Sequence, residues 1–125
     1  MMPPAWMSSV IHDFGHSAGV GSLALNERGV AVLKFENGTA LRLEYVDGEL
    51  LVAMTVPSAD VKRLLSLSHP KARHAFRVRA GVIPKTREAV AAVRLAERDV
   101  TLPRLNAAFE LLWRLAREIG GAAWA

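Results

Sequence analysis

The chain of 125 residues contains no cysteine, and it has no long uninterrupted apolar run. The absence of cysteine excludes a disulfide scaffold and thiolate metal sites, and it suits a reducing compartment. No window approaches the roughly 18 apolar residues that a membrane-spanning helix needs. The first six residues carry no lysine or arginine, so we expect no secretory signal and a cytosolic location.

Acidic residues are absent from one segment in the middle of the chain. Residues 61–87 hold eight basic residues and no acid, whereas residues 1–60 have a net charge of −4. This basic patch comprises Lys62, Arg63, Lys71, Arg73, Arg77, Arg79, Lys85 and Arg87. Basic clusters bind phosphate, so a small nucleic-acid-binding or regulatory protein is the alternative function. The patch matches no groove-reading module, and its one aromatic residue is Phe76, which disfavours that alternative.

Two turn signals between apolar runs are the strongest positive pattern. Asn37-Gly38 and Asp47-Gly48 each separate alternating apolar segments, which is typical of β-hairpins. We therefore expect an antiparallel meander of three strands between residues 30 and 56. The second strand alternates apolar and charged residues, which indicates one exposed face, whereas the third is apolar enough to be buried on both faces.

Helical patterns flank this meander. Apolar residues recur at helical spacing from Pro4 to Ser17, and glycines follow. Thr101 is a candidate N-cap for a last helix that ends at Gly120 and Gly121. The apolar seam of that helix comprises Leu102, Leu105, Phe109, Leu112, Ala116 and Ile119, widened by Trp113. Between meander and last helix we expect a short helix over 58–67, a strand over 74–80, a loop over 81–86 and a strand over 90–96.

This order predicts the α+β fold class, with one domain over residues 1–125 and an antiparallel sheet packed by helices. The chain is long enough to bury a core, and its apolar fraction of 51% argues against disorder.

Three short patterns suggest chemistry, but their context argues against it. Gly15–Gly19 matches the G-x-S-x-G nucleophile elbow, which requires a preceding strand where this chain has a helix. Gly19–Ala24 matches a dinucleotide fingerprint with its flanking elements in the reverse order. His12 and His16 are spaced to share a metal, but no third ligand is obvious. We expect no enzyme, no catalytic residue, no metal and no cofactor.

The apolar stripe of the first helix includes Trp6, Val10 and Phe14. Core packing explains such a stripe, but it lies beside a meander with a possible open edge. An apolar groove next to a free strand edge is what an extended peptide needs for docking.

The chain resembles the class I chaperones of bacterial type III secretion, the Tir-chaperone-like (CesT-type) family. The matching text is the glycine-rich end of the first helix before L-A-L-N-E-R-G-V-A-V-L-K-F, the turn E-N-G-T, and the strands A-L-R-L-E-Y-V and E-L-L-V-A-M-T-V. The closing T-L-P-R-L-N-A-A-F-E-L-L-W-R-L-A is also similar to the family's last helix. The likeness covers nearly the whole chain through pattern and spacing.

This resemblance implies a cytosolic homodimer that binds the N-terminal segment of a secreted effector and keeps it extended for export. It places effector contacts loosely at Trp6, Val10 and Phe14. We expect Trp6→Asp or Phe14→Asp to weaken effector binding while leaving a folded dimer. It places the dimer contact at Val61, Leu64, Leu65, Phe76 and Val78. Members of the family are typically acidic, whereas this chain is basic. Its arginines are therefore expected to splay outward in the dimer, or to meet an acidic effector segment or another export component.

Overall fold

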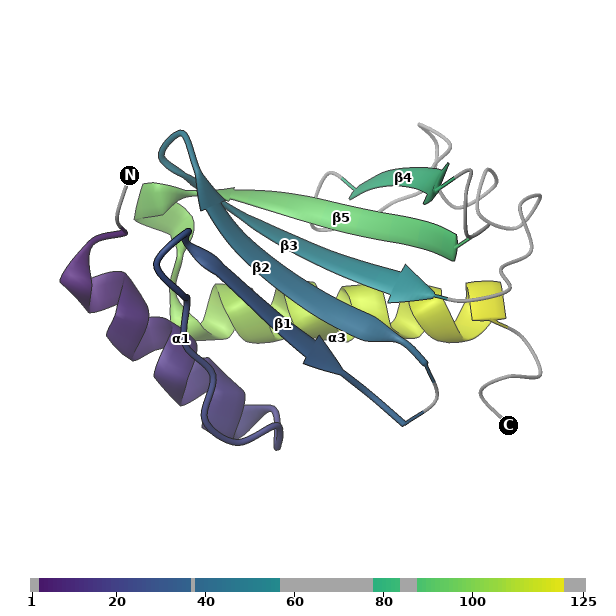
Figure 1. Cartoon of the computed structure of the whole chain (residues 1–125), viewed down its shortest axis with the longest axis horizontal. Helices are drawn as coiled ribbons and strands as arrows, with labels where there is room; N and C mark the ends of the chain where they lie inside the picture. The colour runs from purple at the N-terminus through teal and green to yellow at the C-terminus, as the bar shows by residue number, and fades with distance from the viewer. Residues whose placement is uncertain (1–2, 37, 57–77, 84–87, 121–125) are drawn as a thin grey trace.

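The computed structural model describes residues 3–36, 38–56, 78–83 and 88–120 of the chain (Figure 1). Its elements are α1 (Ala5–Ser17), β1 (Val30–Lys34), β2 (Ala40–Val46), β3 (Glu49–Val56), β4 (Val78–Ile83), β5 (Glu88–Ala96), the 3-10 turn η1 (Glu97–Asp99) and α3 (Leu102–Gly120). The α+β class and the order of these elements are confirmed. The short helix expected over 58–67 lies outside the described residues. No helix in the described ranges is long and apolar enough to span a membrane.

The five described strands form one antiparallel sheet in the order β1-β2-β3-β5-β4. The meander of β1, β2 and β3 is confirmed. Its second turn places Asp47 at φ 52° and Gly48 at φ 74°, the left-handed conformation that two-residue hairpins require. Helices α1 and α3 lie on one side of this sheet (Figure 1). We call that side the helix face and the opposite side the outer face.

The last two strands differ from the expectation at their boundaries. Gly81, predicted to begin a loop, belongs to β4 and pairs with Val90 of β5. The prediction of a loop was wrong over residues 81–83, because Gly81 is a residue without a side chain on a continuous ladder. Residues 84–86 lie outside the described residues. Residues 74–77, where the strand was predicted to begin, lie outside the described residues. The strand expected over 90–96 is confirmed and extends back to Glu88.

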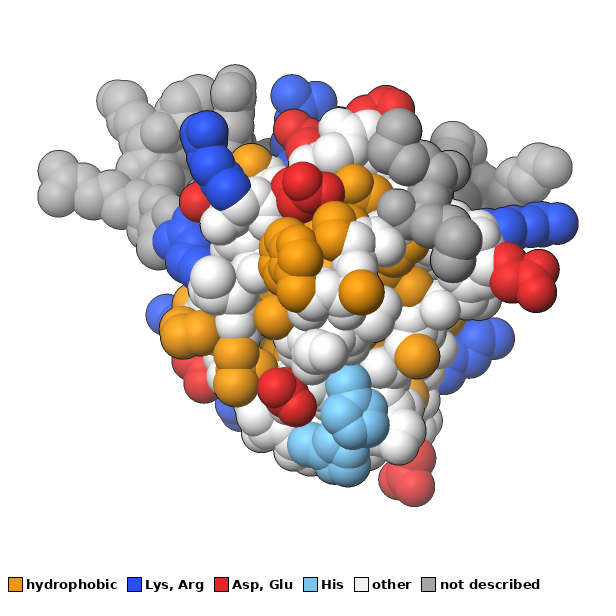
Figure 2. Space-filling model, turned by 90° about the vertical axis from the view of Figure 1, so that its left-hand side faces the viewer, with side chains coloured by type: hydrophobic (Ala, Val, Ile, Leu, Met, Phe, Trp, Pro, Cys, Tyr) orange, Lys and Arg blue, Asp and Glu red, His pale blue; other side chains and the backbone are white. Residues whose placement is uncertain are grey.

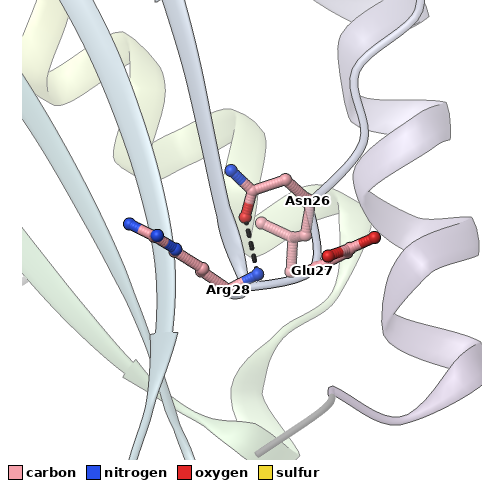
Figure 3. A pocket seen from close by; sticks show the side chains of 4 residues that line it. Asn26, Glu27 and Arg28 are labelled. Carbon is pink, nitrogen blue, oxygen red and sulfur yellow. Dashed lines mark hydrogen bonds between the residues drawn. The ribbon is translucent and has the colours of Figure 1, made fainter.

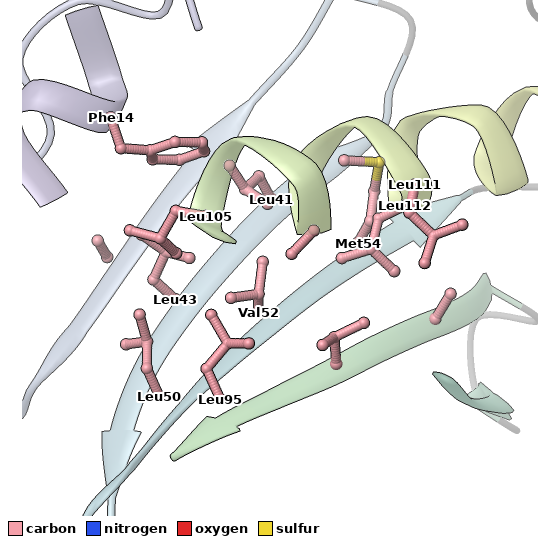
Figure 4. Packing of buried hydrophobic residues seen from close by; sticks show 14 of the residues in the cluster. Phe14, Leu41, Leu43, Leu50, Val52, Met54, Leu95, Leu105, Leu111 and Leu112 are labelled. Atoms are coloured by element: carbon pink, nitrogen blue, oxygen red, sulfur yellow. The ribbon is translucent and has the colours of Figure 1, made fainter. Parts of the chain in front are cut away.

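The core lies between the helix face and α3, with α1 closing one end (Figure 4). Residues of three strands and both helices are almost fully buried there, among them Phe14, Leu43, Val52, Met54, Leu95, Leu105 and Leu112. Ala89 and Ala91 of β5 are also buried against this core, so small side chains serve a strand here. On β3, the predicted burial of both faces was wrong in part. Ala53 is buried on the outer face, but its neighbours Leu51 and Thr55 are only half-buried, because no described element covers them.

The end of α1 and the start of α3 follow the expected local rules. Gly19 and Gly21 adopt φ 76° and 83° after α1, so the G-x-S-x-G and dinucleotide matches are parts of a helix stop. The backbone N–H of Arg104 donates to Thr101 Oγ1 at 3.3 Å, which confirms the N-cap of α3. The seam of α3 is confirmed at Leu105, Leu112 and Ala116, whereas Leu102 and Phe109 are half-buried at its margin. The side chain of Ile119 is outside the described set.

Candidate functional site

Strand β1 forms one edge of the described sheet. The backbone N–H of Phe35 donates to Thr39 O, and that of Tyr45 donates to Gly29 O, both at 2.8 Å. In an antiparallel pair, the backbone groups of every second residue bond to the partner strand. The backbone groups that face β2 are therefore those of Gly29, Ala31, Leu33 and Phe35. The backbone groups of Val30, Val32 and Lys34 therefore point away from β2, towards the edge.

The beginning of this edge is closed by Asn26. Its side-chain Oδ1 accepts a hydrogen bond from the backbone N–H of Arg28 at 2.9 Å (Figure 3). It accepts a second from the backbone N–H of Val30 at 3.1 Å. The Asn26 N–H in turn donates to Val30 O at 2.8 Å. An open hollow of ≈ 580 Å³ lies over this turn, lined by residues 25–28. Both edge groups of Val30 are thus occupied, and the open edge consists of Val32 and Lys34.

A strip of aromatic side chains crosses from α3 to the end of β1. It consists of Phe35, Phe109 and Trp113, each half-buried, and we call it the aromatic strip. The ring centroids of Phe35 and Trp113 are 4.9 Å apart, and those of Phe109 and Trp113 are 5.7 Å apart. Phe109 also contacts the buried Phe14 ring edge to face, at 5.7 Å between centroids. The strip therefore joins the end of β1 to α3 and, through Phe14, to α1.

Phe35 was not predicted from the sequence to be part of this surface. Its parity places it on the helix face with Ala31 and Leu33, and it follows β1 directly. The alternation of Ala31, Leu33 and Phe35 was visible in the sequence, but no role was predicted for Phe35. Phe109 and Trp113 were identified as parts of the α3 seam, although neither is fully buried.

The three effector-contact residues predicted on α1 are in different environments. Trp6 is 45% exposed, Val10 is half-buried, and Phe14 is 0% exposed. Apolar side chains gather on the α1 side of the molecule, above the two described histidines (Figure 2). Met7, Ile11 and Phe14 turn towards the core, so the exposed apolar surface of α1 is offered by Trp6 and the margin of Val10.

His12 and His16 lie next to each other on the exposed side of α1, with ring centroids 4.7 Å apart. Within the described ranges no group of three histidine, cysteine or acidic side chains is arranged to hold a metal ion. Ser17, the serine of the elbow motif, donates its hydroxyl to Asn106 Oδ1 at 2.8 Å, which ties the end of α1 to α3.

Of the predicted dimer contact, Val78 alone lies in the described part of the chain, half-buried on β4. Of the basic patch, Arg79 alone is described, exposed on the outer face of the same strand. The remaining predicted residues are outside the described ranges: Val61, Lys62, Arg63, Leu64, Leu65, Lys71, Arg73, Phe76, Arg77, Lys85 and Arg87.

This arrangement, a five-stranded antiparallel sheet with helices on one face, has the fold of the type III secretion chaperones. A chain of the ExsC–ExsE complex matches with a TM-score of 0.72 and 21% identity, over 92% of each chain. A chain of the ExoT–SpcS complex from Pseudomonas aeruginosa matches with a TM-score of 0.71 and 15% identity, over 94% of this chain and 99% of that one. The Yersinia pestis chaperone SycH in complex with a YscM2 fragment matches with a TM-score of 0.68 and 16% identity, over 90% and 98%.

The family follows from the sequence itself. The family model of the type III secretory system chaperone SycN matches residues 6–120, and the chain belongs to this family. The sequence-based prediction of a type III secretion chaperone, and not an enzyme, is therefore confirmed. A comparison with individually curated proteins found no matching relative.

Proposed function

We propose that this chaperone holds the N-terminal segment of a secreted effector extended and competent for export. The observation that supports this most is the open edge of β1 at Val32 and Lys34, with the aromatic strip beside it. Strand addition supplies backbone hydrogen bonds, and pockets for alternate side chains supply selectivity. The structures with the same fold include the HopA1–SchA chaperone–effector complex and the ExoT–SpcS complex.

The register of β1 determines which side chains of an added strand would meet the aromatic strip. Residues opposite Val32 and Lys34 would pair with their backbones and project to the outer face. The residue between them would project to the helix face, as Leu33 does, and an apolar side chain there would extend the aromatic strip. An acidic residue opposite Lys34 would pair with its ammonium group. The proposed segment therefore alternates apolar and polar residues and carries an acid opposite Lys34.

The exposed apolar part of α1 gives the same effector a second contact. In the folded chain, Trp6 is exposed and Val10 is half-buried, so both are accessible to a partner. Phe14 instead holds α1 against α3 through its contact with Phe109. An apolar side chain at one end of the effector segment would cover Trp6, and large aromatic residues of this kind are enriched among binding hot spots.

We further propose that the working unit is a cytoplasmic homodimer without a cofactor. Its two-fold contact would use Val61, Leu64, Leu65, Phe76 and Val78, as the family resemblance implies. The edge of β4 that faces away from β5 has no described strand beside it, which suits a contact between two copies. Components of the export apparatus are candidate partners for the basic patch.

The first experiment identifies the effector that the chain binds, which we call the client. Affinity capture of the tagged chain from its native cells, after nuclease treatment, followed by mass spectrometry is expected to retain one larger protein through its N-terminal segment. Recovery of bound material only when the nuclease is left out would overturn the chaperone proposal in favour of the nucleic-acid alternative.

The edge is then tested with that client segment. Val32→Pro removes the outward N–H of Val32, and an edge strand tolerates this change because that N–H has no partner in the sheet. Calorimetry is expected to show about fivefold to tenfold weaker binding, as expected when one backbone hydrogen bond worth about 1 kcal/mol is lost. Val32→Ala removes the side chain and keeps the N–H, so it serves as the matched control. Equal affinity of the two variants would remove the β1 edge from the site.

A further inference from the structure

The outer face of the sheet carries an apolar floor that no described element covers. Both described helices lie on the opposite side (Figure 1). Ala53 on β3 is nevertheless only 5% exposed. Leu51 and Ala92 beside it are half-buried. This face is therefore more apolar than the solvent-facing side of a sheet needs to be.

Two arginines stand over this floor. Arg79 of β4 pairs across the ladder with Ala92 of β5, and Arg94 of β5 pairs with Leu51 of β3. The four residues line a hollow of ≈ 300 Å³. A second hollow of ≈ 130 Å³ continues from it past Leu51 and Arg94, towards Glu44, Val46 and Glu49. The larger hollow thus combines an apolar floor with a guanidinium group from each of two adjacent strands.

Within the described residues, neither guanidinium makes a strong ion pair. Arg94 contacts Glu49 at 3.3 Å, but the two side chains are 64% and 44% exposed, and exposed pairs of this kind contribute little. Arg79 has no ion pair within the described residues. A carboxylate brought into the hollow would therefore meet one uncommitted arginine and one held by an exchangeable contact.

From these contacts we infer a second docking site, on the outer face, for an acidic and apolar peptide segment of a protein partner. A carboxylate of that segment lies between Arg79 and Arg94, and the adjacent apolar side chain packs on Leu51 and Ala92. The charge of the sequence supports the sign of the partner, since Arg79 belongs to a segment with eight basic residues and no acid. The site is on the opposite face of the sheet from the aromatic strip, so it adds to the proposed effector site and does not depend on it.

The probe for this site is a fluorescein-labelled peptide of alternating glutamate and leucine, and binding to the full chain is followed by anisotropy. Arg79→Glu is expected to weaken binding at least about tenfold, because a charge-assisted contact is replaced by repulsion. Arg114→Glu makes the same charge change at an exposed position of α3 and is the matched control. Ala92→Glu places a carboxylate into the hollow itself and is expected to abolish binding without disturbing the core.

Further probes separate charge from apolar contact. A peptide with serine in place of leucine and one with lysine in place of glutamate are both expected to bind at least about tenfold more weakly. Because an alternating peptide also fits the edge of β1, the measurements are repeated in the Val32→Pro background, where Arg79→Glu is expected to weaken binding to the same extent. Equal effects of Arg79→Glu and Arg114→Glu would overturn the inference. So would a change of oligomeric state in Arg79→Glu without loss of peptide binding, which would assign this face to a second copy of the chain.

Discussion

At the scale of single residues, Trp6 and Phe14 show what helical periodicity does and does not determine. Both belong to one apolar stripe in the sequence, yet Trp6 is 45% exposed and Phe14 is fully buried. Helical periodicity shows which residues lie on the same side of a helix. Which part of that side faces the core depends on how the helix is rotated against its partners. In α1 the core side is centred on Met7, Ile11 and Phe14.

Substitution by aspartate separates these two residues. Trp6→Asp is expected to leave the thermal unfolding transition nearly unchanged and to weaken binding of the effector segment. Phe14→Asp is expected to abolish that transition, since losing a buried phenylalanine costs about 3–5 kcal/mol before the cost of burying a charge is added. The burial of Phe14 thus contradicts the expectation that both aspartate variants stay folded. Circular dichroism melts and calorimetry check both outcomes, and a cooperative melt of Phe14→Asp would contradict the assignment to the core.

Tyr45 makes the stability of the fold depend on pH in the alkaline range. Its hydroxyl donates to Glu97 Oε1 at 2.7 Å, and this hydrogen bond, then burial, then the charge of Glu97 raise the pKa of Tyr45 above 10.0. The folded chain keeps the tyrosine proton at a pH where the unfolded chain loses it. The stability that this contact supplies is therefore fully present below a pH of about 10 and is lost as the pH rises through the higher folded pKa.

Urea unfolding between about pH 8 and 11 tests this dependence. The free energy of unfolding is expected to fall more steeply above about pH 10 in the native chain than in Tyr45→Phe, which has no hydroxyl to titrate. Parallel curves for the two proteins would show that the contact with Glu97 is absent in solution.

At the scale of elements, the end of α1 depends on the lack of a side chain at Gly15. A Cβ at this position would meet the carbonyl oxygen of Gly21 and would lie 2.9 Å from Leu23 Cβ. The segment after α1 folds back over this point, and the N–H groups of Val20 and Gly21 both donate to Gly15 O. The returning chain and the helix therefore approach each other closely at this glycine.

Gly15→Ala is expected to destabilise the chain by about 1–3 kcal/mol, because backbone atoms must move to admit the methyl group. In an unobstructed position of a helix, replacing glycine by alanine would instead stabilise the chain. Ser9→Ala on the exposed side of α1 is the control, and its free energy of unfolding is expected to change little. A Gly15→Ala variant as stable as the native chain would show that residues 21–23 yield without cost.

The hairpin and the last helix could be predicted from the sequence because their signals are local. Asp47 and Gly48 define a two-residue turn, and Thr101 caps the helix that follows it in sequence. Strand β5 was harder, because its alanines are also typical of a helix. Two of them, Ala89 and Ala91, are buried against the core, and this packing favours the strand. Local propensity does not contain that information, since it comes from an element distant in sequence.

At the scale of the whole molecule, the strand order was not predictable from the sequence. The pairing of β3 with β5 joins residues such as Val52 and Val93, which are far apart in the chain. The same holds for the two arginines of the outer face. Arg79 was identified only as one of eight basic residues, and Arg94 was not singled out. Their convergence on Leu51 and Ala92 follows from the ladder and from no sequence motif.

The proposed homodimer is tested by sedimentation. The native chain is expected to sediment at about twice its mass of 13.6 kDa. Leu65→Asp, in the proposed two-fold contact, is expected to shift the chain to the monomer. Val46→Asp is the control, because Val46 is an exposed apolar residue on the outer face at a distance from that contact in the sequence. A dimer that persists in Leu65→Asp would contradict the proposed interface.

The bond pattern of Asn26 has a further consequence for the behaviour of the chain at high concentration. Exposed strand edges pair readily with one another and lead to aggregation, and natural proteins counter this with short edges and with lysine. Asn26 occupies the backbone of Val30, so only two residues of β1 stay available, and one of them is Lys34. Two copies that met along this edge would bring their Lys34 side chains close together over a ladder too short to compensate for the repulsion. The edge of β1 is therefore protected against polymerisation while it stays accessible to a strand of complementary sequence.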